Sequence, residues 1–304
     1  MRRDITFASQ GLRCSGWLYL PDDHPTDHKA PAIVMAHGFS AVKEMCLSHF
    51  AERFMAAGFV TLVFDFRYLG HSEGKPRGQL FPHEQREDYC NAISWLSDHP
   101  QVDPERIGVW GTSFSGGIAM HLAAFDKRVK AVAVQVPSVH NWESRRRMDS
   151  ERFDKASTFL MQDRIARYKT GAVNYLKVVA PEREPSALPT AEAYEWFMEA
   201  SKIAPSWRNQ VTVESLEKIR EFDPAGPIHL IAPTPLMIIV AEHDSLIPFN
   251  LIVDAYERAS EPKAISVLPC GHFDVYTEPW FSRAAGAAVD WFMQYLGKTH
   301  SSSM

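Results

Sequence analysis

The stretch Arg106-Ile-Gly-Val-Trp-Gly-Thr-Ser-Phe-Ser-Gly-Gly-Ile-Ala-Met120 changes character in its middle. An apolar run of strand length, Arg106–Trp110, leads into a glycine-rich turn, and a helical pattern follows from about residue 115. A strand, a sharp turn and a helix form the context that a nucleophilic serine on a strained turn requires. Ser113 stands at the centre of the turn, so the stretch indicates either such a nucleophile or an ordinary serine in a glycine-rich connection.

The residues two before and two after a nucleophile on such a turn must be small, because larger side chains would collide across it. Gly111 meets this requirement, whereas Ser115 stands where the usual G-x-S-x-G pattern has its second glycine. Serine is small, and Gly116 and Gly117 allow the helix to pack close to the strand. The pattern therefore predicts a nucleophile at Ser113 and departs from the usual form at Ser115.

Further apolar runs alternate with helical patterns on both sides of this stretch. Continuous apolar runs are typical of strands buried on both faces, as in a parallel sheet that helices cover. We expect an α/β fold with a mostly parallel, doubly wound sheet and an antiparallel N-terminal edge. The expected strands are Asp4–Phe7, Leu12–Leu20, Ala32–Ala36, Val60–Phe64, Arg106–Trp110, Ala131–Val136, Leu236–Val240 and Ala264–Leu268, and the expected helices cover about 46–57, 83–98, 115–125, 249–259 and 279–296.

One long segment interrupts the alternation. Between residues 138 and 232 no run suits a buried strand, but charged and aromatic residues form helical patterns near 150–167, 190–200 and 213–222. A structureless loop of this length is unusual within a compact domain, so we expect a helical insertion. The predicted organisation is a core of residues 1–137 and 233–297, the insertion 138–232 and a flexible tail, 298–304.

Composition limits the class of protein. The 304 residues, 45% of them hydrophobic, suffice for one large core. The net charge of -5 comes from well-mixed acids and bases, so we expect neither nucleic acid nor a membrane as a partner. Asp4, Ser9 and Gln10 stand where a signal peptide needs an apolar run, which favours a cytoplasmic protein. The four cysteines lack paired spacing, so neither zinc nor a disulfide framework is expected.

A serine hydroxyl becomes a good nucleophile when a base takes its proton and an acid orients that base. Asp244 and His272 each follow an expected late strand at its carboxyl end. Ligands bind beyond these ends in open α/β sheets, so both residues can converge with Ser113, in the chain order serine, acid, histidine. Glu242 and Asp274 remain alternative acids, and Asp244 has the alternative role of capping the next helix.

Negative charge that develops on a substrate oxygen needs two backbone N–H donors. One expected donor is Phe114, the residue after the nucleophile. The other is Phe39, in the loop His37-Gly38-Phe39-Ser40 that follows the strand ending at Ala36. We expect His37 to brace this loop by hydrogen bonding rather than to transfer protons.

The motifs together resemble the α/β-hydrolase superfamily, and most closely its dienelactone-hydrolase-like and polyketide-release serine hydrolases. Elbows with serine at the place of Ser115 also occur in these proteins. The resemblance implies the α/β-hydrolase fold, a lid formed by the insertion, and esterase, thioesterase or acyltransferase chemistry. It rests on the segments His37–Phe39, Phe64–Gly74, Trp110–Gly117, Ala241–Asp244, Gly271–His272 and Ser215–Pro224.

We expect a serine hydrolase that needs no cofactor or metal and cleaves a carboxylic ester or thioester of a small-molecule or carrier-bound acyl group. Acyl transfer from the same acyl-enzyme, peptidase activity and a non-catalytic ligand-binding fold are the alternatives, and a homodimer stays open. Aromatic residues of the insertion have two alternative places, the acyl pocket or the insertion's own core. They are Trp142, Phe153, Phe159, Tyr175, Tyr194, Trp196, Phe197 and Trp207.

Overall fold

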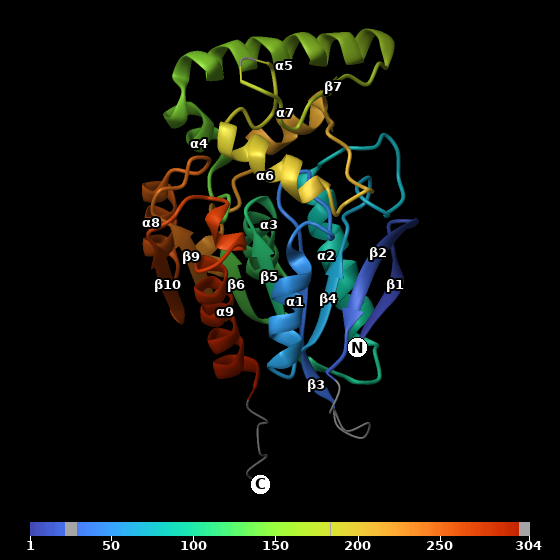
Figure 1. The fold of residues 1–304 in the computed structure, drawn as a ribbon, viewed down its shortest axis with the longest axis vertical. Coiled ribbons are helices and arrows are strands. Elements are labelled where there is room, and N and C mark those ends of the chain that lie inside the picture. The colour runs from blue at the N-terminus through green and yellow to red at the C-terminus, as the bar shows by residue number, and fades with distance from the viewer. Residues whose placement is uncertain (22–28, 183, 298–304) are drawn as a thin grey trace.

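A computed structural model describes residues 1–21, 29–182 and 184–297, so the predicted tail, 298–304, lies outside the described residues. One sheet in the order β1-β2-β4-β3-β5-β6-β9-β10 forms the core (Figure 1). The pairs β1–β2 and β2–β4 are antiparallel and the other pairs are parallel, which confirms the predicted sheet and its N-terminal edge. The strands are β1 (Arg2–Ser9), β2 (Leu12–Tyr19), β3 (Ala30–Ala36), β4 (Val60–Phe64), β5 (Val102–Thr112), β6 (Val129–Gln135), β9 (Leu236–Ala241) and β10 (Lys263–Leu268).

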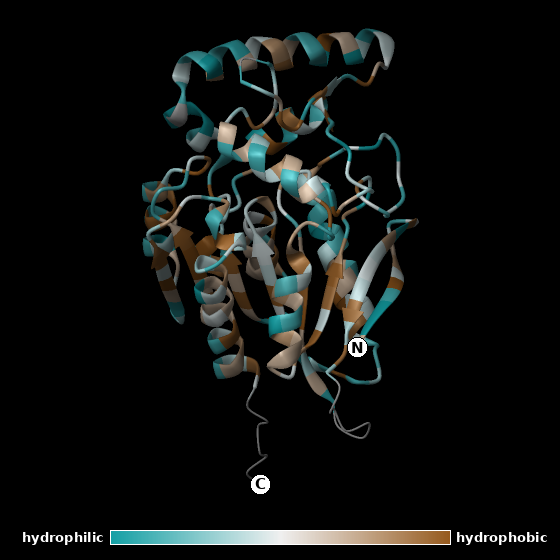
Figure 2. Ribbon diagram, viewed as in Figure 1, coloured by the Kyte–Doolittle hydropathy of each residue, from teal (hydrophilic) through white to brown (hydrophobic). Residues whose placement is uncertain are grey.

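Helices cover the sheet. Figure 1 shows α1 (Leu47–Ala56) and α9 (Trp280–Leu296) in front of it and α2 (Pro82–Ser97) and α3 (Phe114–Phe125) behind, while α8 (Phe249–Arg258) packs against β9. The central strands are buried on both faces and brown in Figure 2, as their continuous apolar runs predict. At Gly108 in β5 a Cβ would lie 2.8 Å from side-chain atoms of Phe292 and Leu296. The glycine therefore lets α9 approach the sheet closely.

The insertion between β6 and β9 lies beyond the carboxyl ends of the parallel strands (Figure 1). Helices occur at the three predicted places, but the sequence pattern does not predict α4 or the β7–β8 pair. α4 is short and almost wholly polar, and each of the two strands has only two residues. The elements are α4 (Asn141–Met148), α5 (Ser150–Thr170), β7 (Tyr175–Leu176), α6 (Ala191–Ser201), β8 (Val211–Thr212), α7 (Val213–Glu221) and the 3-10 turn Ile228–Leu230.

The helix α5 shows how local sequence sets the ends of an element. The Asp149 side chain accepts a hydrogen bond from the Arg152 N–H at its start, and Gly171, with φ 68°, ends it in the left-handed region. Most of its exposed residues are polar, but Phe159, Met161, Ile165 and Tyr168 are exposed as well, and Figure 2 shows teal and brown alternating along the helix. Across the described parts of the chain, no helix is both long enough and apolar enough to cross a membrane.

Candidate active site

Ser113 lies on a strained turn between β5 and α3. Its φ of 53° and ψ of -119° are unfavourable for a residue with a side chain, and such strain is typical of functional turns. A Cβ at Gly111 would lie 2.4 Å from the carbonyl oxygen of Ser115, so only glycine fits there. The structure thus contains the sharp turn that the sequence predicts, with the serine at its apex.

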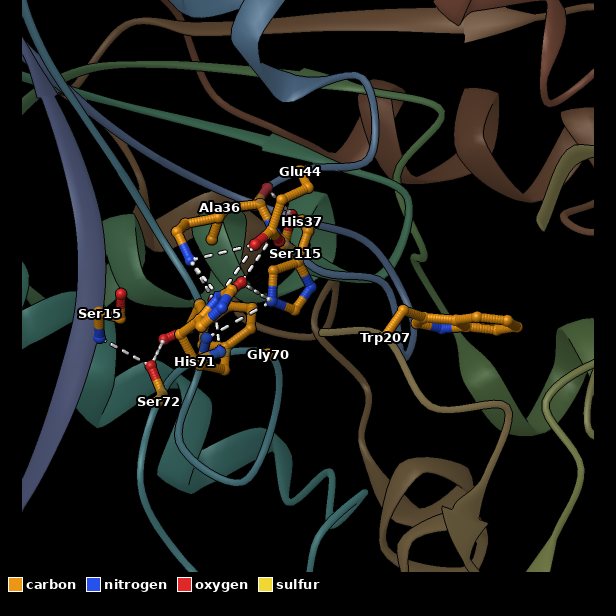
Figure 3. A network of polar contacts seen from close by, with 12 residues as sticks. Ser15, Ala36, His37, Glu44, Gly70, His71, Ser72, Ser115 and Trp207 are labelled. Carbon is orange, nitrogen blue, oxygen red and sulfur yellow. Dashed lines mark hydrogen bonds and ion pairs between the residues drawn. The ribbon is translucent and has the colours of Figure 1, made fainter. Parts of the chain in front are cut away.

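Ser115 has a structural role that glycine could not fill. Its buried hydroxyl donates to the carbonyl oxygen of Ala36 at 2.7 Å and accepts from the backbone N–H of Thr112 at 3.0 Å. Figure 3 shows Ser115 beside Ala36, the last residue of β3. The serine therefore joins the turn at Ser113 to the start of the loop that carries Phe39.

We expect Ser115→Ala to lower the free energy of unfolding by about 1–3 kcal/mol, because the buried Thr112 N–H loses its acceptor. Urea unfolding followed by circular dichroism measures the effect. A matched control is Ser97→Ala, which removes a half-buried hydroxyl bonded only within its own helix and should change stability by no more than about 0.5 kcal/mol. Equal effects of the two substitutions would contradict the role given to Ser115.

The three residues predicted to act together lie within hydrogen-bonding distance. His272 Nε2 is 3.1 Å from Ser113 Oγ, and His272 Nδ1 is 2.7 Å from Asp244 Oδ2. The side chains of His272 and Asp244 are 2% and 0% exposed, so water does not compete for this pair. A proton on Nδ1, facing the carboxylate, leaves Nε2 free to accept the serine proton.

Of the three acids considered from sequence, Asp244 is the one that contacts the histidine. Its Oδ1 also accepts the backbone N–H groups of Leu246 and Ile247, both at 2.8 Å, so the carboxylate both orients its own loop and meets His272. The Glu242 side chain is exposed, and Asp274 Oδ2 accepts the N–H of Gly271 at 2.7 Å. Asp274 therefore shapes the histidine loop instead of contacting the imidazole.

Two backbone N–H groups stand beside Ser113 without an assigned acceptor among the described residues. The Phe114 N–H belongs to the first turn of α3, where no intrahelical acceptor exists and the helix dipole is positive. The Phe39 N–H lies in the neighbouring loop, and the two phenyl rings meet edge to face at 6.2 Å. At Gly38 a Cβ would lie 3.2 Å from the Cβ of Ser113, so this loop runs directly alongside the serine.

His37 is buried below this loop and bonds on both ring nitrogens. Nδ1 donates to the Gly38 carbonyl at 3.0 Å, which leaves Nε2 to accept the N–H of Phe66 at 3.4 Å. Burial lowers the pKa of His37, with the nearby Asp65 acting in the opposite direction. A neutral ring with both nitrogens occupied braces the loop, in agreement with the role expected from sequence.

A polar network holds the other end of the same loop (Figure 3). Glu44, Asp65 and His71 are close enough together to ligate a metal ion. The Lys43 ammonium lies among them, 2.6 Å from Asp65 Oδ2 and 3.3 Å from His71 Nδ1. Its charge compensates the carboxylates, so the network fits a structural clamp on the loop that carries Phe39 better than a metal site.

Ser113 and His272 open into a cavity of about 40 Å³. Its walls are mainly apolar, and the insertion contributes Leu188, Trp196 and Phe197. Of the eight aromatic residues predicted for either pocket or core, Trp196 and Phe197 line this cavity. Trp207 stacks behind Phe197 at 5.5 Å, outside the lining, so both alternatives occur within the insertion.

Other lining residues were not singled out from sequence. Met45 and Tyr276 belong to the core and reach the cavity from its sides. Tyr276 bonds the Thr112 side chain at 2.6 Å and packs against Trp196 at 5.1 Å. In the sequence, the only feature that pointed to Tyr276 as a lining residue was its position four residues after His272. Met45 stands in a loop that carries no motif, so its role follows only from the fold.

The sheet and the strained serine turn define the chain as an α/β hydrolase. The model of the X-Pro dipeptidyl-peptidase (S15) family matches residues 11–274, and the chain belongs to this family.

Proteins that are similar to this chain over most of its length agree with its assignment to the α/β hydrolases. Quorum-quenching protein AidA of Acinetobacter baumannii (strain MDR-ZJ06) is 31% identical over 96% of this chain and 95% of AidA. Thiohydrolase aneE of Aspergillus aculeatus (strain ATCC 16872 / CBS 172.66 / WB 5094) is 33% identical over 83% of this chain and 80% of its own. The crystal structure of the alpha/beta hydrolase GrgF from Penicillium sp. sh18 has a TM-score of 0.83 at 26% identity, covering 98% of this chain and all of that one (100%). The family and these similarities identify the protein as an enzyme of the serine hydrolase and acyltransferase kind, as predicted.

Proposed function

We propose that the protein cleaves a carboxylic ester or thioester through a catalytic triad of Ser113, His272 and Asp244. The observation that carries this proposal is the continuous relay from the serine through the imidazole to the carboxylate, with separations of 3.1 and 2.7 Å. The relay begins at a strained turn and faces an apolar cavity. The name thiohydrolase, which the relative aneE carries, supports the substrate class.

In the first half of the proposed reaction, Ser113 Oγ attacks the carbonyl carbon while His272 Nε2 takes the hydroxyl proton. Asp244 stabilises the imidazolium that forms. The N–H groups of Phe39 and Phe114 bind the oxyanion of the tetrahedral intermediate. When the intermediate collapses, the proton on Nε2 passes to the departing alcohol or thiol, and the acyl group remains on Ser113.

In the second half, a water molecule attacks the acyl-enzyme and His272 takes its proton as a general base. The same two N–H groups hold the second oxyanion. Collapse of this intermediate breaks the bond to Ser113, whose oxygen receives the proton from Nε2, and releases the carboxylic acid. Every step uses side chains and backbone groups of this chain, so the proposed cycle needs no cofactor.

The cavity dimensions support a role of the insertion, 138–232, as a lid. A volume of about 40 Å³ holds only a few water molecules, since one water needs roughly 10–15 Å³ by the same measure. A larger acyl group therefore needs Trp196, Phe197 or Leu188 to move aside before the cavity can hold all of it. The substrate that fits these apolar walls is a small-molecule or carrier-bound acyl group.

The experiment that tests this function compares p-nitrophenyl esters of graded acyl length, the matching thioesters and an X-Pro p-nitroanilide. We expect turnover of esters and thioesters that depends on acyl length. Turnover of the anilide alone would replace the proposal with the peptidase activity that the family's name describes. Absence of turnover together with no labelling of Ser113 by a serine-directed phosphonate would favour a non-catalytic fold.

Acyl transfer is a second candidate function, in which an alcohol or amine replaces water in the second half. The mainly apolar walls of the cavity favour it because they offer few polar groups to hold an attacking water. A relative named polyketide transferase, ATR5 of Stachybotrys chlorohalonatus (strain IBT 40285), supports it as well. Mass spectrometry of products formed with added alcohol and amine acceptors separates the two outcomes, since transfer yields a condensed product and hydrolysis yields the free acid.

The cavity also yields a prediction about acyl length. We expect Trp196→Ala to shift the preference in kcat/KM towards longer acyl esters by about tenfold, because it removes a large wall of the pocket. The control is Trp142→Ala, which removes an exposed indole that packs against Phe153 away from the cavity. A shift of equal size in both variants would mean that Trp196 does not set the acyl preference.

A further inference from the structure

A carboxylate of the insertion contacts both loops that carry the proposed acid and base. Glu192, in the first turn of α6, accepts a hydrogen bond from the backbone N–H of Phe273 on Oε1 at 3.2 Å. Its Oε2 accepts the hydroxyl of Ser245. Phe273 directly follows His272, and Ser245 directly follows Asp244. One side chain of the insertion therefore bridges the neighbours of two triad residues.

Local features hold Glu192 in this position. Thr190 begins α6, with its hydroxyl accepting the N–H of Ala193 at 3.2 Å, and a carboxylate in the first turn is stabilised by the helix dipole. At Gly271 a Cβ would lie 3.0 Å from Glu192 Oε1, so the glycine before His272 leaves room for the carboxylate. Burial, together with the charges of Asp274, Asp244 and Glu192, raises the pKa of the nearby Cys270 thiol to about 11.

The helix that carries Glu192 also forms the roof of the cavity. Trp196, one turn further along α6, lines the cavity and stacks on Phe273 with ring centres 5.1 Å apart. Phe197 lines the cavity as well, whereas Glu192 does not. A movement of α6 that admits an acyl group therefore breaks the two hydrogen bonds of Glu192 unless both loops move with the helix.

We propose that Glu192 is a positioning residue that couples closure of the insertion to alignment of Asp244 and His272. This inference rests on the proposed function. With α6 closed, the Glu192 carboxylate ties the two loops together and holds the imidazole towards Ser113. With α6 displaced, the loops lose this tie and the serine loses its aligned base. Acylation is thereby confined to the closed state, in which the reaction is shielded from bulk water.

The test is a kinetic comparison of the wild-type protein with Glu192→Ala, using a short-chain p-nitrophenyl ester. We expect kcat to fall by about tenfold to 100-fold with KM little changed, because misplacement of a catalytic group by about 1 Å costs that much. The rate at which a serine-directed phosphonate labels Ser113 should fall by the same factor. A cover that merely shields the cavity would change KM and leave labelling intact.

Two further variants in the same helix, α6, sharpen the comparison. Glu192→Gln keeps an oxygen for the Phe273 N–H and offers an amide N–H to Ser245 Oγ, so it should retain most of the wild-type kcat. Glu195→Ala removes an exposed carboxylate of α6 that has no hydrogen bond or ion pair within the described chain, and should behave as wild type. If Glu192→Ala fails to fold, Ser245→Ala removes one arm of the bridge and should lower kcat with KM unchanged.

Several outcomes would overturn the inference. A change in KM alone, a kcat no lower than that of Glu195→Ala, or a loss in Glu192→Gln as large as in Glu192→Ala would each remove the bridging role. Ser113→Ala is measured in parallel, so that failure of the proposed function can be distinguished from failure of the role given to Glu192. Retained turnover in Ser113→Ala defeats the proposed function, whereas an inactive Ser113→Ala beside an unaffected Glu192→Ala defeats only the role of Glu192.

Discussion

Ser113→Ala is expected to lower kcat for ester or thioester cleavage by about 10⁶-fold while leaving the thermal unfolding midpoint close to that of the wild type. The proposed mechanism has no second nucleophile at this place, because the neighbouring hydroxyl of Ser115 already donates to Ala36. Alanine keeps the Cβ that the turn at Ser113 already accommodates, so we expect the fold to survive. Steady-state turnover of p-nitrophenyl esters and thermal unfolding measure the two effects.

Phosphonate labelling provides the control for Ser113. A serine-directed phosphonate should label the wild type at one site, identified by peptide mass spectrometry, and should not label Ser113→Ala. Retained turnover in this variant would exclude Ser113 from the mechanism. Labelling at another serine would redirect the proposal to that residue and to the base nearest to it.

Asp244→Asn is expected to lower kcat by about 10⁴-fold. The amide oxygen of the asparagine stays with the N–H groups of Leu246 and Ile247, so its NH2 group faces His272 Nδ1 and the imidazole takes the wrong tautomer or loses its orientation towards Ser113. Steady-state kinetics on the same esters measure the loss. The variant also tests which of Asp244, Glu242 and Asp274 orients the imidazole, a choice that the sequence alone left open.

Two neutralised neighbours serve as matched controls for Asp244. Glu242→Gln alters an exposed carboxylate two residues away and should keep wild-type kcat. Asp274→Asn keeps an oxygen that can accept the Gly271 N–H, so it should retain most activity. A loss in either control as large as that of Asp244→Asn would assign the role of the acid to the other residue.

The proposed lid role of the insertion and the proposed role of Glu192 rest on one property of the fold. The insertion lies beyond the carboxyl ends of the parallel strands, where the loops with Ser113, Asp244 and His272 also meet (Figure 1). A segment in that place both roofs the cavity and contacts the loops that form its walls. In the proposed mechanism, substrate entry and alignment of the reacting groups are therefore linked through the same helix, α6.

Local patterns in the chain were sufficient to predict the core and to place Ser113, Asp244 and His272 at neighbouring strand ends. Runs such as Ala32–Ala36 are apolar at every position because both faces of a central strand are buried, so their composition reveals them directly. The turn at Ser113 can be recognised in the sequence because steric limits admit only small flanking residues such as Gly111. These constraints act within a few residues and can therefore be read from sequence.

Tertiary structure alone decided which distant residues meet. Asp244, Glu242 and Asp274 are equivalent in chemistry, and the choice of Asp244 depends on a loop that the N–H groups of Leu246 and Ile247 orient towards His272. Leu188 reaches the cavity and Glu192 reaches the catalytic loops only through the packing of the insertion on the core. Such contacts join residues more than fifty positions apart, and nothing in the local pattern of either partner records the other.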